Sequence, residues 1–257
     1  MKFRKLRYIN LAANLEQDLI IDTNKFSFNA RFLCNYLSKE VRKLNIAGDG
    51  TYNMISVVLS TNHSDCRLRY GTDYPDVLSV SLHISDDEQR EYNAMTDLND
   101  RYEFYLQQLE NGYLYASKFK KVPIAELMKL HEQFRINDYK NEWLWKKRLI
   151  RDYGLYIFFK CYFTTFEFRL ELEAYDIHKT ALLTKGVVFR TGPDEIFFDK
   201  DFRKLEIQNG KLMILDFLDK PNFEIDLATL AKGIFNVRPI EYSRNDGYKN
   251  LIESITW

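Results

Sequence analysis

The segment LYIFFKCYFTTFEFRLELEAY, residues 155–175, decides the fold of the second half of the chain. Apolar residues occupy its odd positions up to Phe163 and its even positions from Phe166 onward, so the alternation slips once, at Thr164 and Thr165. Alternation with a period of two is typical of β-strands that bury one face. A hairpin that turns at the two threonines would explain the slip, and so would a β-bulge that bends one long strand.

We favour the hairpin, because one strand over residues 155–175 would far exceed the usual length of about 3–10 residues. A Thr-Thr pair is poor chemistry for a two-residue turn, so a four-residue loop is the alternative. The two-residue turn predicts the core pairs Phe163 with Phe166, Cys161 with Phe168, Phe159 with Leu170 and Ile157 with Leu172.

The other face of this hairpin carries charges and aromatic rings. The same register pairs Tyr162 with Glu167, Lys160 with Arg169, Phe158 with Glu171 and Tyr156 with Glu173. The four charges can neutralise one another as a lattice, with each contact worth only tenths of a kcal/mol. The three rings would be costly to leave bare, so we expect a helix of this chain or a partner to cover them.

Asn209-Gly210 predicts a second hairpin, because this dipeptide is the strongest short signal for a two-residue turn. It pairs Ile207 with Leu212 and Leu205 with Ile214. The segments GVVFR, EIFFD and NFEIDL are further candidate strands, and DLATLAKGIF is a candidate short helix. The C-terminal half is therefore expected to be an antiparallel β-sheet of hairpins.

The N-terminal half mixes helices with short strands. The predicted strands cover residues 3–9, 18–22, 52–60, 77–85 and 113–121. The predicted helices are an apolar stripe from Leu33 to Leu44, a capped helix from Ser85 that stops at Asn111-Gly112, a helix that begins at Pro123, and a partly exposed helix over residues 141–154. The fold class is α+β, with the mixed half first.

The bulk composition bounds the domain organisation. The chain has 257 residues, 46% of them hydrophobic, which is enough for one sizeable core. We expect a single compact domain over residues 1–257, with a change of texture near residues 137–154. Lys plus Arg and Asp plus Glu both number 37, and this balance argues against a protein that binds nucleic acid with its whole surface.

The cysteines and the N-terminus point to a reducing compartment. Cys34, Cys66 and Cys161 cannot all pair within one chain, and their spacing matches no zinc signature. The N-terminal sequence lacks the apolar run of a signal peptide, and no segment approaches about 18 apolar residues. We therefore expect a cytoplasmic protein without a membrane segment.

No motif forms a complete catalytic, metal or cofactor site. HEQFR at His131 has an arginine where a zincin has its second histidine, so an ordinary histidine on a helix surface is expected. HSDC at 63–66 would suit a cysteine nucleophile with a histidine base, but loop composition explains it equally well. AGDGTYN lacks a phosphate-binding fingerprint, and PDE at 193–195 lacks the second half of a nuclease site. The sequence therefore predicts no catalytic residues, no metal ligands and no cofactors.

Basic and aromatic residues alternate in KFRKLR and KFKK, a pattern that suits edge strands better than nucleic-acid binding here. WLWKKR places Trp143 and Trp145 beside cations; they either pack as part of an amphipathic helix or contact a protein.

The sequence favours a non-catalytic protein-binding protein, of which an immunity or antitoxin-type inhibitor is one form. It would dock an acidic-aromatic sheet face onto a basic site of its partner. The alternatives are a structural or adaptor subunit of a larger assembly, such as a phage- or plasmid-borne one, and a hydrolase whose site is scattered through the fold. The candidate contact residues are Tyr156, Phe158, Tyr162, Glu167, Glu171, Glu173, Trp143 and Trp145.

Overall fold

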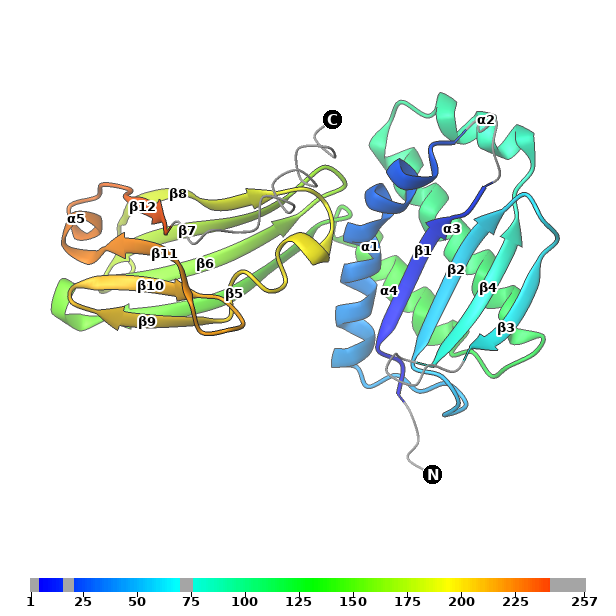
Figure 1. The fold of residues 1–257 in the computed structure, drawn as a ribbon, viewed down its shortest axis with the longest axis horizontal. Coiled ribbons are helices and arrows are strands. Elements are labelled where there is room, and N and C mark those ends of the chain that lie inside the picture. Colours follow the sequence, from blue (N-terminus) through cyan, green and yellow to red (C-terminus); the bar gives the residue numbers. More distant parts are fainter. Residues whose placement is uncertain (1–4, 16–20, 70–75, 241–257) are drawn as a thin grey trace. The chain divides into compact units, whose positions relative to one another are not determined.

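The computed structural model describes residues 5–15, 21–69 and 76–240, and the chain divides into two compact units, Met1–Asn141 and Glu142–Trp257 (Figure 1). The first unit combines a mixed sheet with helices, and the second contains two antiparallel sheets, so the fold is α+β as predicted. The division between Asn141 and Glu142 lies within residues 137–154, where the sequence changes from a mixed α/β pattern to a β-rich one. The single compact domain expected from the sequence stays a prediction.

The first unit contains one four-stranded sheet in the order β1-β2-β4-β3. β1, β2 and β4 run parallel, and β3 is antiparallel to β4. Its elements are β1 (Tyr8–Ala13), α1 (Thr23–Lys43), β2 (Met54–Ser60), β3 (Asp65–Arg69), β4 (Val77–His83), α2 (Asp86–Ala94), α3 (Leu98–Ser117) and α4 (Ile124–Ile136).

Helix α1 protects the outer edge of β1, alongside which it runs in Figure 1. Side chains of the helix accept hydrogen bonds from three N–H groups that β1 does not offer to β2. The bonds run from Ile9 to Ser38 Oγ at 2.9 Å, from Leu11 to Cys34 Sγ at 3.2 Å and from Ala13 to Ser27 Oγ at 3.2 Å. These bonds satisfy the edge that would otherwise recruit another strand.

Two predictions about the helices need correction. The capping box of Ser85 and Glu88 is present, but the helix that it starts, α2, ends at Ala94, and a new helix begins after the N-cap Asp97. Helix α3 then continues through Gly112 to Ser117, so the predicted stop at Asn111-Gly112 and the predicted strand over 113–121 are wrong.

Gly112 serves close packing rather than helix termination. A Cβ atom at this position would collide with the side chain of Val57 on β2. The glycine therefore lets the helix backbone approach the sheet.

The second unit contains two antiparallel sheets in the orders β5-β6-β7-β8 and β12-β11-β10-β9. Its elements are β5 (Asn141–Ile150), β6 (Leu155–Phe163), β7 (Phe168–Asp176), β8 (Leu182–Thr191), β9 (Lys204–Gln208), β10 (Lys211–Leu215), β11 (Pro221–Asp226), α5 (Leu227–Ala231) and β12 (Val237–Pro239), with 3-10 turns at Arg151–Tyr153 and Glu195–Phe197.

The helix predicted over residues 141–154 is a strand. β5 runs to Ile150 and is followed by a 3-10 turn that closes at Gly154, whose φ is 66°. Lysine, arginine and leucine favour a helix here, but pairing with β6 supplies the hydrogen bonds of a sheet and outweighs that weak preference.

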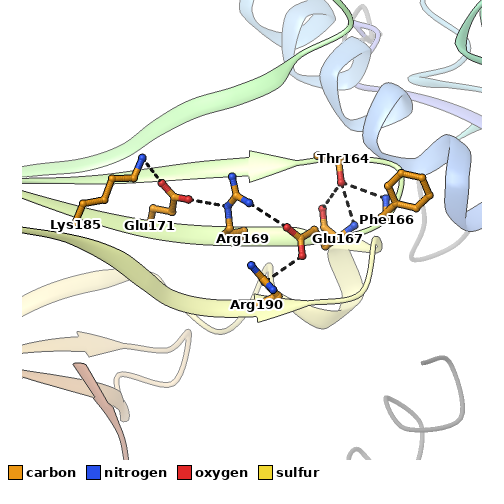
Figure 2. Close-up of polar contacts among 7 residues, drawn as sticks. All are labelled: Thr164, Phe166, Glu167, Arg169, Glu171, Lys185 and Arg190. Atoms are coloured by element: carbon orange, nitrogen blue, oxygen red, sulfur yellow. Dashed lines mark hydrogen bonds and ion pairs between the residues drawn. The ribbon is translucent and has the colours of Figure 1, made fainter. Parts of the chain in front are cut away.

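The hairpin of β6 and β7 is confirmed, and it turns through four residues (Figure 2). The N–H of Thr164 donates to the carbonyl of Glu167 at 2.9 Å, and Thr164 Oγ1 accepts from the N–H groups of Phe166 and Glu167 at 3.2 Å each. The two-residue register is therefore wrong. The true pairs are Phe163 with Phe168, Cys161 with Leu170, Phe159 with Leu172 and Ile157 with Ala174.

The shift moves each partner by two positions, so every side chain keeps its predicted face. The second hairpin is confirmed in its predicted register, with Ile207 opposite Leu212 and Leu205 opposite Ile214. Asn209 and Gly210 have φ values of 48° and 75°, as that type of turn requires.

Aromatic rings fill the space between the two sheets, which lie one over the other in Figure 1. Phe168 of β7 stacks on Phe198 with ring centroids 3.7 Å apart, and it lies parallel to Phe202 at 5.5 Å. The inner face of the β5–β8 sheet is therefore core, and the remaining face is the one that carries the charges.

The strand predicted over residues 18–22 falls mainly outside the described residues, and so does the start of the one predicted over 3–9. Among the helices that the structure describes, none is both long and apolar enough to cross a membrane.

Candidate functional site

Seven charged side chains form one connected set of ion pairs on the outer face of the β5–β8 sheet, and Figure 2 shows the part that joins Lys185 to Arg190. We call this set the ion-pair network. The contacts are Lys185–Glu171 at 2.8 Å, Glu171–Arg169 at 2.8 Å, Arg169–Glu167 at 3.2 Å, Glu167–Arg190 at 3.1 Å, Lys185–Glu173 at 3.5 Å and Glu173–Lys160 at 2.7 Å.

The network buries two of its three carboxylates, and each of its cations is more exposed than any of its carboxylates. Glu171 and Glu173 are each 6% exposed, whereas the side chains of Lys185 and Arg190 are 44% and 59% exposed. Four cations against three carboxylates leave a net charge of one positive. The charge that a partner would meet on this face is therefore mainly positive.

The pKa values of Glu173, Lys160 and Lys185 are shifted toward their ionised forms. Burial raises the pKa of Glu173, but the hydrogen bond and charge of Lys160 outweigh it, so the pKa lies below its usual value. The hydrogen bond to Glu173 raises the pKa of Lys160, and the hydrogen bond to Glu171 raises that of Lys185. A carboxylate with a lowered pKa is a poor general acid, so Glu173 does not have the electrostatics of one.

The three aromatic rings of β6 lie on the same face, half-buried under cations and other rings. Lys179 Nζ lies 4.0 Å from the ring centroid of Tyr156, and the guanidinium of Arg169 lies 4.9 Å from that of Tyr162. Phe158 contacts Tyr156 at 4.9 Å and Tyr175 at 5.6 Å between centroids. Side chains of the same sheet and its β7–β8 turn thus supply the ring contacts.

The structure brings six of the eight predicted contact residues together. Tyr156, Phe158, Tyr162, Glu167, Glu171 and Glu173 share the outer face.

The two tryptophans lie on the inner side. Trp143 contacts Phe168 with ring centroids 5.9 Å apart, and Trp145 contacts Phe159 at 5.6 Å and Phe202 at 5.0 Å. They belong to the packing between the sheets rather than to the charged face, and the helix that was expected to carry them is β5.

The corrected register also changes the cross-strand partners on the charged face. Lys160 lies opposite Glu171 instead of Arg169, and Tyr162 lies opposite Arg169. The like-charged pair that the two-residue turn implied does not form.

Sequence reasoning missed Lys185 and Arg190, the two cations that β8 contributes. They are five residues apart, so a regular strand would place them on opposite faces. A register shift between Leu170 and Glu171 leaves Val188 without a partner on β7 and lets both cations reach the glutamates. The apolar–polar alternation of β8 could have placed both cations on the charged face only if the position of the bulge had been known.

Two of the other candidate motifs form local structure. Asp49 of AGDGTYN accepts hydrogen bonds from the N–H and hydroxyl of Thr51 at 2.8 and 2.6 Å, which is an Asx turn. Asp194 of PDE caps a 3-10 turn by accepting from the N–H of Ile196 at 3.0 Å.

The histidine and cysteine motifs also differ from a catalytic arrangement. His131 is fully buried instead of lying on a helix surface. Burial raises the pKa of the Cys66 thiol, which disfavours the thiolate that a nucleophile needs. Among the residues that the structure describes, no group of three or more His, Cys, Asp and Glu side chains is arranged to hold a metal ion.

Comparison with known proteins assigns no relative to the chain. No family model matches it, and it matches no curated protein and no solved structure. Its function therefore has to be inferred from the site.

Proposed function

We propose that this is a non-catalytic protein-binding protein that docks through the outer face of its β5–β8 sheet. The observation that carries the proposal is the half-buried group of Tyr156, Phe158 and Tyr162 beneath an exposed layer of lysine and arginine. Tyrosine and arginine are enriched among the residues that dominate binding energies at interfaces.

Exposed apolar side chains adjoin the network and would supply contact area. Val187 lies opposite Glu171 on this face, Leu182 lies opposite Tyr175, and Phe166 at the tip of the β6–β7 turn is 60% exposed. An interface core of aromatic and aliphatic groups with a charged rim is the usual anatomy of a protein contact.

A protein partner fits this face better than a nucleic acid. Nucleic-acid affinity comes largely from cations that neutralise phosphates and release counterions. The cations of the network are already paired with three glutamates, and the chain as a whole has a net charge of zero.

The partner is expected to present an acidic surface, because the most exposed charges of the network are positive and two of its three carboxylates, Glu171 and Glu173, are buried. This reverses the sign expected from the sequence, in which the glutamates were to face a basic site. An immunity or antitoxin-type inhibitor remains one form of the proposed role, now with an acidic surface on its target.

The test is co-purification from the native host, with charge reversal at two exposed positions. Arg190→Glu together with Lys179→Glu should weaken partner binding at least about tenfold, since steering and rim charges both reverse. Neither residue supports Glu171 or Glu173, so folding should persist. The matched control is Lys200→Glu with Lys232→Glu, which makes the same charge change at exposed positions elsewhere in the unit.

Recovery of one partner by the wild type and the control, but not by the charge-reversed variant, would support the proposal. Equal recovery by both variants would refute docking at this face. If the wild type alone, without a protein partner, shifts the electrophoretic mobility of an oligonucleotide, the ligand of this face would be a nucleic acid instead. A stable multi-subunit complex would favour the adaptor role over an inhibitor.

A further inference from the structure

The sheet of the first unit has one apolar face and one polar face. Helix α3 packs against the apolar face, where Gly112 touches Val57, and α3 and α4 lie behind the sheet in Figure 1. The opposite face carries small polar side chains on its parallel strands, including Asn10, Ser56 and Ser79. Parallel strands are normally apolar on both faces, so this composition calls for an explanation.

A hollow of about 300 Å³ lies on the polar face. The described residues that line it are all polar or charged: Asn14, Ser60, Asn62, His63, Asp65, Arg67, Arg69, Ser79 and Ser81. Its size is at the lower end of pockets that hold small molecules, which span roughly 300–1,000 Å³.

The hollow begins at the carboxyl ends of the parallel strands β1 and β2 and extends along β3 to Arg69, which lies opposite Val77, the first residue of β4. Asn14 follows β1 directly, and Ser60 is the last residue of β2. Ligands of open α/β sheets bind outside the carboxyl ends of their strands, where the loops diverge. The end of the hollow beside Asn14 and Ser60 thus lies where such sheets bind ligands, which independently supports a ligand here.

Small side chains form the floor, and the edge strand forms a wall. Because the side chains of Ser79 and Ser81 of β4 are small, the surface of the hollow lies close to the strand backbone there. Their cross-strand neighbours on β3 are Arg67 and Asp65, which lie opposite Ser79 and Ser81 respectively. Long side chains therefore stand beside hydroxyl groups on one face.

The charge of the hollow favours an anion. Arg67 forms an ion pair with Asp65, whereas Arg69 has no carboxylate partner among the described residues. Among the described lining residues, two arginines against one aspartate leave one positive charge, and the exposed His63 adds a ring nitrogen that can donate.

We propose that this hollow binds a small phosphorylated ligand of the sugar-phosphate class. The guanidinium of Arg69 would hold the phosphate through paired N–H donors, a geometry that arginine matches better than lysine does. The serine hydroxyls and asparagine amides would bond to the hydroxyls of the sugar. Among the described lining residues there is no tryptophan, tyrosine or phenylalanine on which a nucleobase could stack, so the sugar phosphate is favoured over longer nucleic acids.

The test is calorimetric titration of the full chain with ribose 5-phosphate, with inorganic phosphate and ribose in parallel. Ribose 5-phosphate should bind most tightly, and inorganic phosphate should bind more weakly than ribose 5-phosphate. Arg69→Gln should weaken binding by about tenfold or more, because it removes charge-assisted hydrogen bonds to the phosphate. The matched control Arg148→Gln removes an exposed arginine in the second unit and should leave binding unchanged.

A second variant separates loss of charge from loss of space. Ser81→Leu should abolish ribose 5-phosphate binding by filling the hollow while both arginines remain. The proposal fails if the wild type does not bind ribose 5-phosphate, if Arg69→Gln and Arg148→Gln bind it equally, or if ribose binds as tightly as its phosphate.

Discussion

At the residue scale, the environment decides what a glutamate does. Glu167, Glu171 and Glu173 have the same side chain and alternate along one strand, so the sequence suggested an acidic surface. In the structure Glu171 and Glu173 lie beneath lysine and arginine side chains. Removing one partner of a buried pair leaves an uncompensated charge, so charge reversal at exposed cations tests the surface without the loss of stability that changes at these glutamates would cause.

His131 is the clearest single-residue determinant of pH dependence. Its ring is fully buried, and among the described residues neither nitrogen has a hydrogen-bond partner. Burial and then the charge of Arg135 lower the pKa of His131 to about 4, while Glu103 acts in the opposite direction. The unfolded chain therefore binds this proton at higher pH than the folded chain does.

His131 should consequently stabilise the fold fully above about pH 6.5 and progressively less as the pH falls toward 4. Between pH 7.5 and pH 5 the loss should be about 2 kcal/mol, from the linkage of proton binding to folding. Urea unfolding of the wild type and of His131→Phe at both pH values measures it. The variant should lose clearly less stability, and an equal loss would contradict the assignment.

At the scale of elements, contacts between helix and sheet override local signals. Asn111-Gly112 has the composition of a helix stop, yet α3 passes through it because the glycine admits the helix to the surface of β2. The β-bulge in β8 works in the same way, since it exists in the pairing with β7 and not in the sequence of either strand alone.

Gly112→Ala tests this packing. In an isolated helix the change would stabilise by about 1 kcal/mol. Here it should destabilise by about 1–3 kcal/mol, because the new methyl group collides with Val57. A double-mutant cycle with Val57→Ala, measured by denaturant unfolding, should show that the penalty disappears once the valine methyl groups are gone. Additive effects would mean that the two residues do not compete for space.

At the scale of the whole molecule, each compact unit has its own core. The first is built from residues such as Val57, Leu106 and Phe134, and the second from residues such as Phe159 and Phe168. Separate cores are the condition for independent folding.

We therefore expect fragments 1–141 and 142–257 each to fold alone, with cooperative thermal unfolding and dispersed NMR spectra. A fragment that ends at residue 120 is the control. It lacks α4, whose Leu127, Leu130 and Phe134 are buried, and should not fold cooperatively. Fragments that fold only when mixed would favour the single domain expected from the sequence.

The sequence alone determined the α+β class, the Asn209-Gly210 hairpin and the faces of β6 and β7, and it favoured the β6–β7 hairpin over a bulge, because alternation and Asn-Gly turn chemistry act over neighbouring residues. It could not determine the strand identity of β5, the length of α3 or the burial of Glu171 and Glu173. Those features depend on residues far apart in the chain: the partner strand of β5, the valine beneath Gly112, and the cations that β8 places over the glutamates. Tertiary structure decided them because pairing and desolvation are properties of assembled surfaces, and no local pattern encodes them.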